Sequence, residues 1–451
     1  MKQRICLHGV DIKHQAQLLG LVKKLLPACN ASYKVKEKYF ANNDMYKCRV
    51  ARFQPKLRGM EAGYRVLCAW GVLLVSDKPI NIADITLEFA PNNEAALQAV
   101  NNFVERLLSG KQGFILDEPD LSRSIALLRG CYYLDKLEAY DEERAASALL
   151  THVPWQVYGI SKLWEQLLLS GGGQRSLWRQ LRVKLRRLRS VLSLVKPLLP
   201  EPELGKWQQC LKRRAGMLSC VREYDVLLQI CARLHANINI SEQAHALRQQ
   251  RSTEIVQSTL GSMEAVPNLQ RLLQGMRQQA QVRTLQQLKL NENTLELAQL
   301  LIFLQAQSVK GSQESLREFF VWRLGKWARK IQQLPQFCSN MQDMEQQHRV
   351  RIKLKRFRYA LQSVPELSAS PQLLRSLKYL QDALGVVHDD YVNEQYLQQL
   401  VAMHPELPEL RYEVAMLRGW EQAKADAAME QLATQWQEFE GMLGEWLEKL
   451  E

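Results

Sequence analysis

The chain has 451 residues, of which 46% are hydrophobic and 24% are charged, an ordinary globular balance with room for two or more domains. A chain of this size can bury a large core, so it needs neither a metal ion nor disulfide bonds to hold its fold together. The formal net charge of +13 favours polyanionic partners such as nucleic acid, anionic lipid or polyphosphate.

The cysteines and the apolar runs predict a cytoplasmic protein. The nine cysteines are odd in number and include no Cys-x-x-Cys pair, which indicates reduced thiols rather than a disulfide framework. The longest apolar run, residues 66–75, is about half of the ~20 residues that a membrane-spanning helix requires. Arg4, His8 and Asp11 interrupt any signal-peptide core.

Residues 1 to about 120 predict a mixed α/β region. Its strands are marked by β-branched and apolar residues or by alternation of polar and apolar residues, and its helices by a 3.6-residue periodicity. Strands are expected at Gln3–Val10, Tyr64–Ser76 and Asp84–Phe89, and helices at Asp11–Leu26 and Asn93–Leu108.

From Trp155 onward the periodicity predicts helix almost throughout, because apolar residues recur at i, i+3, i+4 and i+7. Residues 420–451 are acidic and rich in tryptophan, and we expect a closing helix packed on a bundle. The fold class is therefore mostly α with a small α+β N-terminal domain. Helix breaks are expected at Gly171–Gly173, Pro197–Pro202, Pro267, Pro335, Pro365–Pro371 and Pro405–Pro408.

A basic segment is repeated in the helical part. Arg179–Arg189 recurs without a gap 169 positions later as His348–Arg358 (348 minus 179). A second echo follows each copy at an offset of 166 (388 minus 222), so the linkers differ by three residues. The sequence therefore predicts an internal duplication. The positions of the second echo are Leu211-Lys212 with Leu377-Lys378, Leu218 with Leu384, and Arg222-Glu223 with His388-Asp389.

The spacing within each basic segment places its cations on one helix face. Positions 179, 182, 186 and 189 follow i, i+3, i+7 and i+10, as do 348, 351, 355 and 358, while Val183, Leu185 and Leu188 are left for packing. Such a row, rising roughly 5 Å per turn, suits a flexible chain of phosphates. A solvated face and binding of nucleic acid or membranes are the alternatives.

The pattern His348-x-x-Arg351-Ile-x-x-Lys355-Arg356-x-Arg358, with its partner Arg182-Val-x-x-Arg186-Arg187-x-Arg189, resembles the CHAD family, the conserved histidine α-helical domain. Leu384-Gly385-x-x-His388-Asp389 fits the same family, and the resemblance covers roughly residues 155–450. It implies two pseudo-symmetric helical halves, about 155–263 and 264–450. Basic helices line a groove between them that binds inorganic polyphosphate, on polyphosphate granules where these are present.

The resemblance carries a set of expected polyphosphate contacts and requires no cofactor or metal. At the signature histidine position the first half has Arg179, so the charge there is permanent. The expected contacts are Arg179, Arg182, Arg186, Arg187, Arg189, Lys212, Arg222, His348, Arg351, Lys355, Arg356, Arg358, Lys378 and His388.

Residues 1–140 resemble a shortened member of the CYTH family, the triphosphate tunnel enzymes. Where that family opens with Glu-x-Glu-x-Lys, this chain has Arg4, Cys6 and His8, which removes the hard oxygen ligands that Mg²⁺ needs. We expect a metal-deficient relative that braces the helical domain or binds phosphate. Its other matching positions are Asp84, Thr86 and Glu88, and the segment Ser122–Tyr133 with Arg123 and Arg129.

The remaining polar residues do not form a recognisable catalytic set, and the eight histidines form no metal-binding pattern. Asp389-Asp390 and Glu223/Asp225 are expected near helix starts, where they complement the helix dipole or orient the arginines. His348 and His388 either donate to phosphate or form hydrogen bonds at a helix interface. We therefore favour a non-catalytic polyphosphate binder. A Mg²⁺-dependent triphosphatase with a CHAD accessory domain and a nucleic-acid-binding protein are the alternatives.

Overall fold

The computed structural model describes residues 3–9, 12, 15–26, 29–34, 46–57, 60–61, 63–75, 78–90, 92–117, 145–248, 266–307, 316–334, 344–362 and 370–450. The chain forms two compact units that interleave along the sequence. Unit 1 comprises Met1–Arg213 and Leu285–Phe319, and unit 2 comprises Arg214–Thr284 and Phe320–Glu451. In the described ranges, no helix combines the length and the apolar character needed to cross a membrane.

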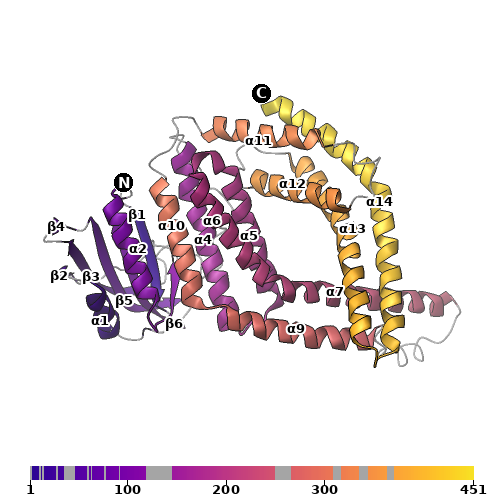
Figure 1. Ribbon diagram of the computed structural model, residues 1–451, viewed down its shortest axis with the longest axis horizontal. Coiled ribbons are helices and arrows are strands. Elements are labelled where there is room, and N and C mark those ends of the chain that lie inside the picture. The colour runs from indigo at the N-terminus through magenta and orange to yellow at the C-terminus, as the bar shows by residue number, and fades with distance from the viewer. Residues whose placement is uncertain are drawn as a thin grey trace. The chain divides into compact units, whose positions relative to one another are not determined.

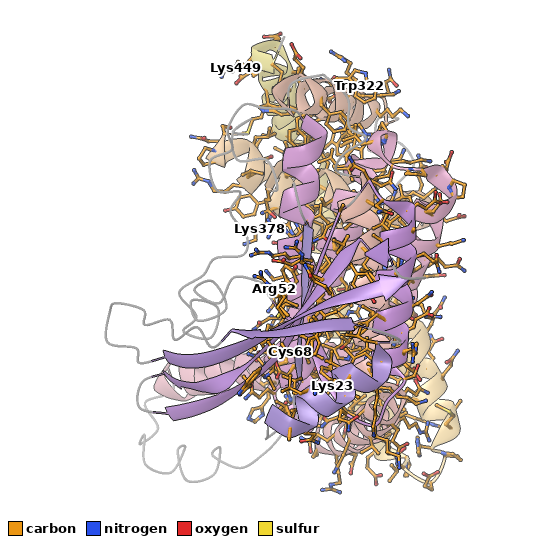
Figure 2. The ribbon with its side chains drawn as sticks, turned by 90° about the vertical axis from the view of Figure 1, so that its left-hand side faces the viewer. Lys23, Arg52, Cys68, Trp322, Lys378 and Lys449 are labelled. Atoms are coloured by element: carbon orange, nitrogen blue, oxygen red, sulfur yellow. The ribbon has the colours of Figure 1, made fainter. Side chains whose placement is uncertain are left out.

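Unit 1 contains an antiparallel sheet in the order β2-β3-β5-β6-β1-β7, with β4 pairing to β3 (Figures 1 and 2). The three predicted strands are β1, β5 and β6. Alternation places Ile85 and Leu87 in the core, and Cys68 is buried within the sheet (Figure 2). The strands are β1 (Gln3–Gly9), β2 (Cys29–Lys34), β3 (Tyr46–Leu57), β4 (Met60–Glu61), β5 (Tyr64–Val75), β6 (Lys78–Phe89) and β7 (Phe114–Asp117).

Two helices near the sheet match the predicted ones, α1 (Gln15–Leu25) and α2 (Glu94–Leu108). The side chain of Asn93 caps α2 by accepting a hydrogen bond from the backbone N of Ala96 at 3.0 Å. The apolar stripe of α2 is buried. At its other end Arg106 donates to the carbonyl of Leu25, which ties α2 to the end of α1.

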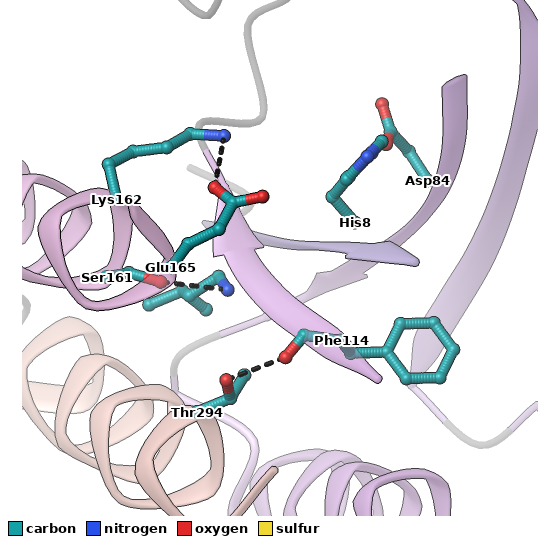
Figure 3. A network of polar contacts seen from close by, with 8 residues as sticks. His8, Asp84, Phe114, Ser161, Lys162, Glu165 and Thr294 are labelled. Atoms are coloured by element: carbon teal, nitrogen blue, oxygen red, sulfur yellow. Dashed lines mark hydrogen bonds and ion pairs between the residues drawn. The ribbon is translucent and has the colours of Figure 1, made fainter. Parts of the chain in front are cut away.

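The edge strand β7 is fastened to two helices of the same unit, α4 (Ala145–Leu169) and α10 (Leu290–Gln307). Thr294 Oγ1 donates to the carbonyl of Phe114 at 2.7 Å, and Ser161 Oγ accepts from the backbone N of Leu116 at 3.1 Å (Figure 3). Asn291 accepts from the backbone N of Phe114 at 3.1 Å and donates to the carbonyls of residues 110 and 112. These bonds satisfy the outer side of an otherwise open sheet edge.

The predicted helix breaks explain where most of the remaining helices begin. Gly171 and Gly172 adopt positive φ between α4 and α5, and Pro267 and Pro371 are the first residues of their helices. Pro335 and Pro365 lie outside the described residues. The remaining helices are α5 (Arg175–Leu194), η1 (Lys196–Leu198), α6 (Glu201–Met217), α7 (Ser219–Arg248), α9 (Pro267–Gln287), α11 (Leu316–Gln332), α12 (Met344–Gln362), α13 (Pro371–Met403) and α14 (Glu409–Leu450).

The core of unit 2 joins α7, α9, α13 and α14, and α13 and α14 run side by side (Figure 1). The Glu413 carboxylate of α14 accepts from the backbone N of Leu269 at 2.7 Å, so an acid complements the start of α9. The predicted closing helix is the greater part of α14, and its Trp446 packs edge-on against Phe357 of α12. The mostly α prediction with a small N-terminal sheet is therefore confirmed.

The bonds of Asn291 to the sheet edge predict a stability effect. Asn291→Ala removes three hydrogen bonds and should lower the free energy of unfolding by roughly 2–3 kcal/mol. Urea denaturation followed by circular dichroism measures the change. Gln286→Ala, at an exposed position of α9, is the control and should change stability by less than about 0.5 kcal/mol. Equal effects of the two substitutions would contradict this account of the edge.

Candidate basic site

The first basic row lies on α5, beside the apolar stripe that holds this helix in unit 1. The side chain of Arg179 is exposed, while those of Arg182, Arg186 and Arg189 are partly buried. Arg187 is also partly buried. The stripe consists of Leu177, Trp178, Leu181, Leu185, Leu188 and Leu192. Packing of this stripe turns the guanidinium stems toward one flank of the helix.

The second row lies on α12 in unit 2 and repeats this arrangement. Val350, Leu354, Phe357 and Leu361 are buried in a stripe at i, i+4, i+7 and i+11. His348, Arg351, Lys355 and Arg358 are partly buried next to that stripe, and Arg356 is exposed. The predicted one-face arrangement is thus found on each helix taken separately.

One packing expectation was wrong. Val183 is only partly buried, and its counterpart Ile352 is 37% exposed, because both lie on the flank of the cation row rather than on the buried stripe. Leu185 and Leu188 pack as expected. Each row is therefore bordered by an aliphatic side chain that remains accessible.

Several row cations have no acidic partner among the described residues. No carboxylate of the described chain lies within 4.0 Å of Arg179, Arg186, Arg356 or Arg358. The Nε atoms of Arg186 and Arg358 are buried, and no acceptor among the described residues forms a hydrogen bond with them. A buried donor without a partner costs about 1–3 kcal/mol, so these side chains are poised to gain from an incoming acceptor.

The predicted residues outside the two rows lie on three other helices. Lys212 is exposed on α6, Arg222 is partly buried on α7, and Lys378 is exposed on α13 (Figure 2). His388 is partly buried on α13. Within unit 2, α13 packs on α12 and brings His388 to the second row.

The contact between α12 and α13 centres on Arg351. Its Nη2 lies 3.3 Å from Asp389 Oδ1, and the imidazoles of His348 and His388 lie beside it with ring centroids 4.5 Å apart. A Cβ atom built on Gly385 would lie 3.4 Å from the same guanidinium nitrogen. The sequence pattern had marked these residues but could not predict that they meet.

The environment of His388 keeps its imidazole neutral. Burial is the main cause that lowers its pKa to about 4, and the charges of Arg351 and His348 lower the pKa further. Asp389 opposes this shift but does not overcome it. The imidazole that α13 brings to the second row, that of His388, is therefore uncharged at neutral pH.

The expectation for the acidic pairs was wrong for Asp389-Asp390. These residues lie in the middle of α13, far from its start at Pro371, because the helix continues through Gly385 without a break. The other interpretation, an ion pair that orients an arginine, fits Asp389 and Arg351. Asp225 near the start of α7 is 2% exposed and pairs with Arg277 at 2.7 Å, a structural role.

The N-terminal sheet pairs its acidic residues with basic side chains on the neighbouring strand. In the register of β1 with β6, Arg4 is opposite Glu88 and His8 is opposite Asp84. Arg4 Nη2 lies 2.8 Å from Glu88 Oε1, and His8 Nδ1 lies 2.7 Å from Asp84 Oδ1; Figure 3 shows His8 and Asp84. The described residues contain no group of three or more candidate metal ligands. The segment Ser122–Tyr133, with Arg123 and Arg129, lies outside the described residues, and the CYTH resemblance stays a prediction.

Comparison with known proteins decides the family. The model of the CHAD domain matches residues 163–398, more than half of the chain, and includes both basic rows. The chain belongs to the CHAD family. A solved CHAD domain from the plant Ricinus communis is 23% identical, with a TM-score of 0.49, over 69% of this chain and 96% of that one. No curated protein matches the chain.

The lowered pKa of His388 predicts that the stability of the ligand-free protein depends on pH. The folded His388 pKa is about 4 and the unfolded value is about 6.5, so the unfolded chain binds the proton first. The stability that the neutral His388 contributes to the folded state is fully present above about pH 6.5 and is lost as the pH falls toward 4.

Titration of the histidine resonances by NMR measures the pKa directly. Arg351→Gln should raise the pKa of His388, because a neighbouring positive charge is removed. Arg375→Gln, at an exposed position of α13, is the matched control and should leave it unchanged. An ordinary pKa in the wild type would overturn this description of the site.

Proposed function

We propose that this CHAD protein binds inorganic polyphosphate through the basic rows of α5 and α12, without catalysis, in the cytoplasm and on polyphosphate granules where these occur. The observation that carries the proposal is the repeated row of partly buried cations, of which Arg186 and Arg358 have no acidic partner among the described residues. Membership of the CHAD family supports it. In this proposal residues 155–263 and 264–450 are the two repeats, each with one row.

The chemistry of the rows suits phosphate oxygens better than a single small anion. Guanidinium groups offer planar, forked donors, and consecutive members of a row are roughly 5 Å apart along the helix for each turn. Arg182, Arg186 and Arg189 on α5 are matched by Arg351, Lys355 and Arg358 on α12. A flexible polyanion can adjust its phosphates to this spacing, and the predicted contact residues remain the proposed set.

The pairing of the acidic groups supports a binding role rather than catalysis. Asp84 and Glu88 are held by His8 and Arg4 in the sheet, and the buried Asp225 is held by Arg277. A general base or a metal ligand needs an available carboxylate, and in this proposal these carboxylates are instead engaged within the fold. Beside α12, the carboxylate of Asp389 is engaged with Arg351.

The decisive experiment is binding of long-chain polyphosphate to the full chain at several salt concentrations. The test variant is Arg186→Gln with Arg358→Gln, because these two cations have no ion-pair partner among the described residues and their loss breaks no internal ion pair. We expect affinity to fall roughly 100-fold or more and the salt slope to fall by roughly 2.

The control variant is Arg271→Gln with Arg283→Gln, which removes the same charge from exposed positions of α9. Its affinity for polyphosphate should fall only by the small amount that follows from the lower net charge. If the control loses as much affinity as the row variant, diffuse charge explains binding and the rows do not. If the wild type ignores polyphosphate near physiological salt but binds DNA or RNA, nucleic acid is the ligand instead.

A further inference from the structure

His348 of the second row and His388 of α13 form a close pair that has no histidine counterpart in the first repeat. His348 and His388 approach with ring centroids 4.5 Å apart and planes inclined by 40°. The Nδ1 atom of His348 is buried and has no hydrogen-bond partner in the described chain. The equivalent positions in the first repeat are Arg179 and Arg222, at offsets of 169 and 166. One repeat thus carries permanent charge where the other carries titratable groups.

The charges that face the pair are mostly positive. From α12 they are Arg351 and Lys355, and from α13 the acid that acts on His388 is the adjacent Asp389, which is shared with Arg351. The charged groups of α14 engage the other flank of α13, where Arg418 pairs with Glu394. There Glu421 accepts a hydrogen bond from Asn393, and burial together with Glu394 raises the pKa of the Asp390 carboxyl. Burial and the charges around it on α12 and α13 therefore favour the uncharged form of His388.

We propose that the His348–His388 pair takes up a proton from solvent when a polyphosphate chain binds, so that this row binds more tightly as the pH falls while the α5 row does not change. The proposal rests on the proposed function. Phosphate oxygens beside Arg351 and Lys355 cancel the positive potential that opposes an imidazolium. The new N–H then donates a charge-assisted hydrogen bond to the ligand.

Linkage sets the sign and the size of the effect. A ligand that raises the pKa of a group binds better at a pH below the raised value, and the protein must bind a proton as it binds the ligand. If the ligand restores the pKa of His388 from about 4 to its ordinary value near 6.5, affinity should rise about tenfold between pH 7.5 and 5.5. Long chains are the appropriate probe, because most of their phosphates keep a constant charge over this range.

The experiment is calorimetry of long-chain polyphosphate with the full chain at pH 7.5, 6.5 and 5.5. Each titration is repeated in two buffers of different ionisation enthalpy, so that proton uptake is counted directly. The wild type should bind at every pH, gain about tenfold in affinity at the lowest pH and take up about one proton there.

The key variant is His348→Arg with His388→Arg, which gives the second repeat the residue types of the first. Its affinity should not change between pH 7.5 and 5.5, and it should take up no proton on binding. Its folding is checked by circular dichroism, and His348→Gln with His388→Gln provides a second route to the same loss of pH dependence. His404→Gln is the matched control, because it removes a histidine that pairs with Glu406 outside the row, and should keep the wild-type pH dependence.

The outcomes separate the two proposals. Wild-type binding that is equally strong at all three pH values, without proton uptake, overturns the histidine proposal and leaves polyphosphate binding intact. A pH dependence that survives in both double variants assigns the proton to another group and also overturns it. No binding at any pH overturns the proposed function together with the inference that rests on it.

Discussion

The burial of one apolar stripe on each basic helix is the constraint on which the rest of the site depends. Cations at i, i+3, i+7 and i+10 repel one another, and like charges one turn apart cost roughly 0.2–0.5 kcal/mol per pair. Burial of a leucine such as Leu185 or Leu354 contributes about 1.5–3 kcal/mol, so the stripe outweighs the repulsion. Packing thus holds a row of charges that an isolated peptide would disfavour. A bound polyanion would relieve the same repulsion.

The distribution of carboxylates decides which cations remain available. In the sheet, Glu88 and Asp84 each meet a basic side chain on the neighbouring strand, and Asp225 meets Arg277 in the helical core. Among the row cations, Arg351 is approached by Asp389 at 3.3 Å, whereas no described carboxylate lies within 4.0 Å of Arg186 or Arg358. The positive potential of Arg186 and Arg358 is therefore not cancelled by an ion pair within the described residues, and it is available to a polyanion.

Helical periodicity and proline positions predicted the mostly α architecture and the face of each basic row, because both depend on local sequence. Strands β2, β3, β4 and β7 were missed, and β4 has only two residues. The first two carry charged and polar residues such as Lys34, Arg49 and Arg52 instead of a clean alternation, and β7 is only four residues long. The bonds of Asn291 to the sheet edge join residues 177 or more positions apart and leave no local signal. Likewise, the lowered pKa of His388 arises from its burial and then from the charge of Arg351, a neighbour from another helix.

Gly385 illustrates how one helix can dictate a residue on another. A glycine inside a helix costs roughly 1 kcal/mol relative to alanine, and nothing in the backbone of α13 at this position requires it. The guanidinium of Arg351, however, occupies the space beside its Cα, at 3.4 Å from where a Cβ would stand. A methyl group at this position would touch the guanidinium at ordinary van der Waals distance, so the glycine in Leu384-Gly385-x-x-His388-Asp389 leaves the arginine room against α13. A side chain that extends beyond Cβ toward Arg351 would have to displace the guanidinium.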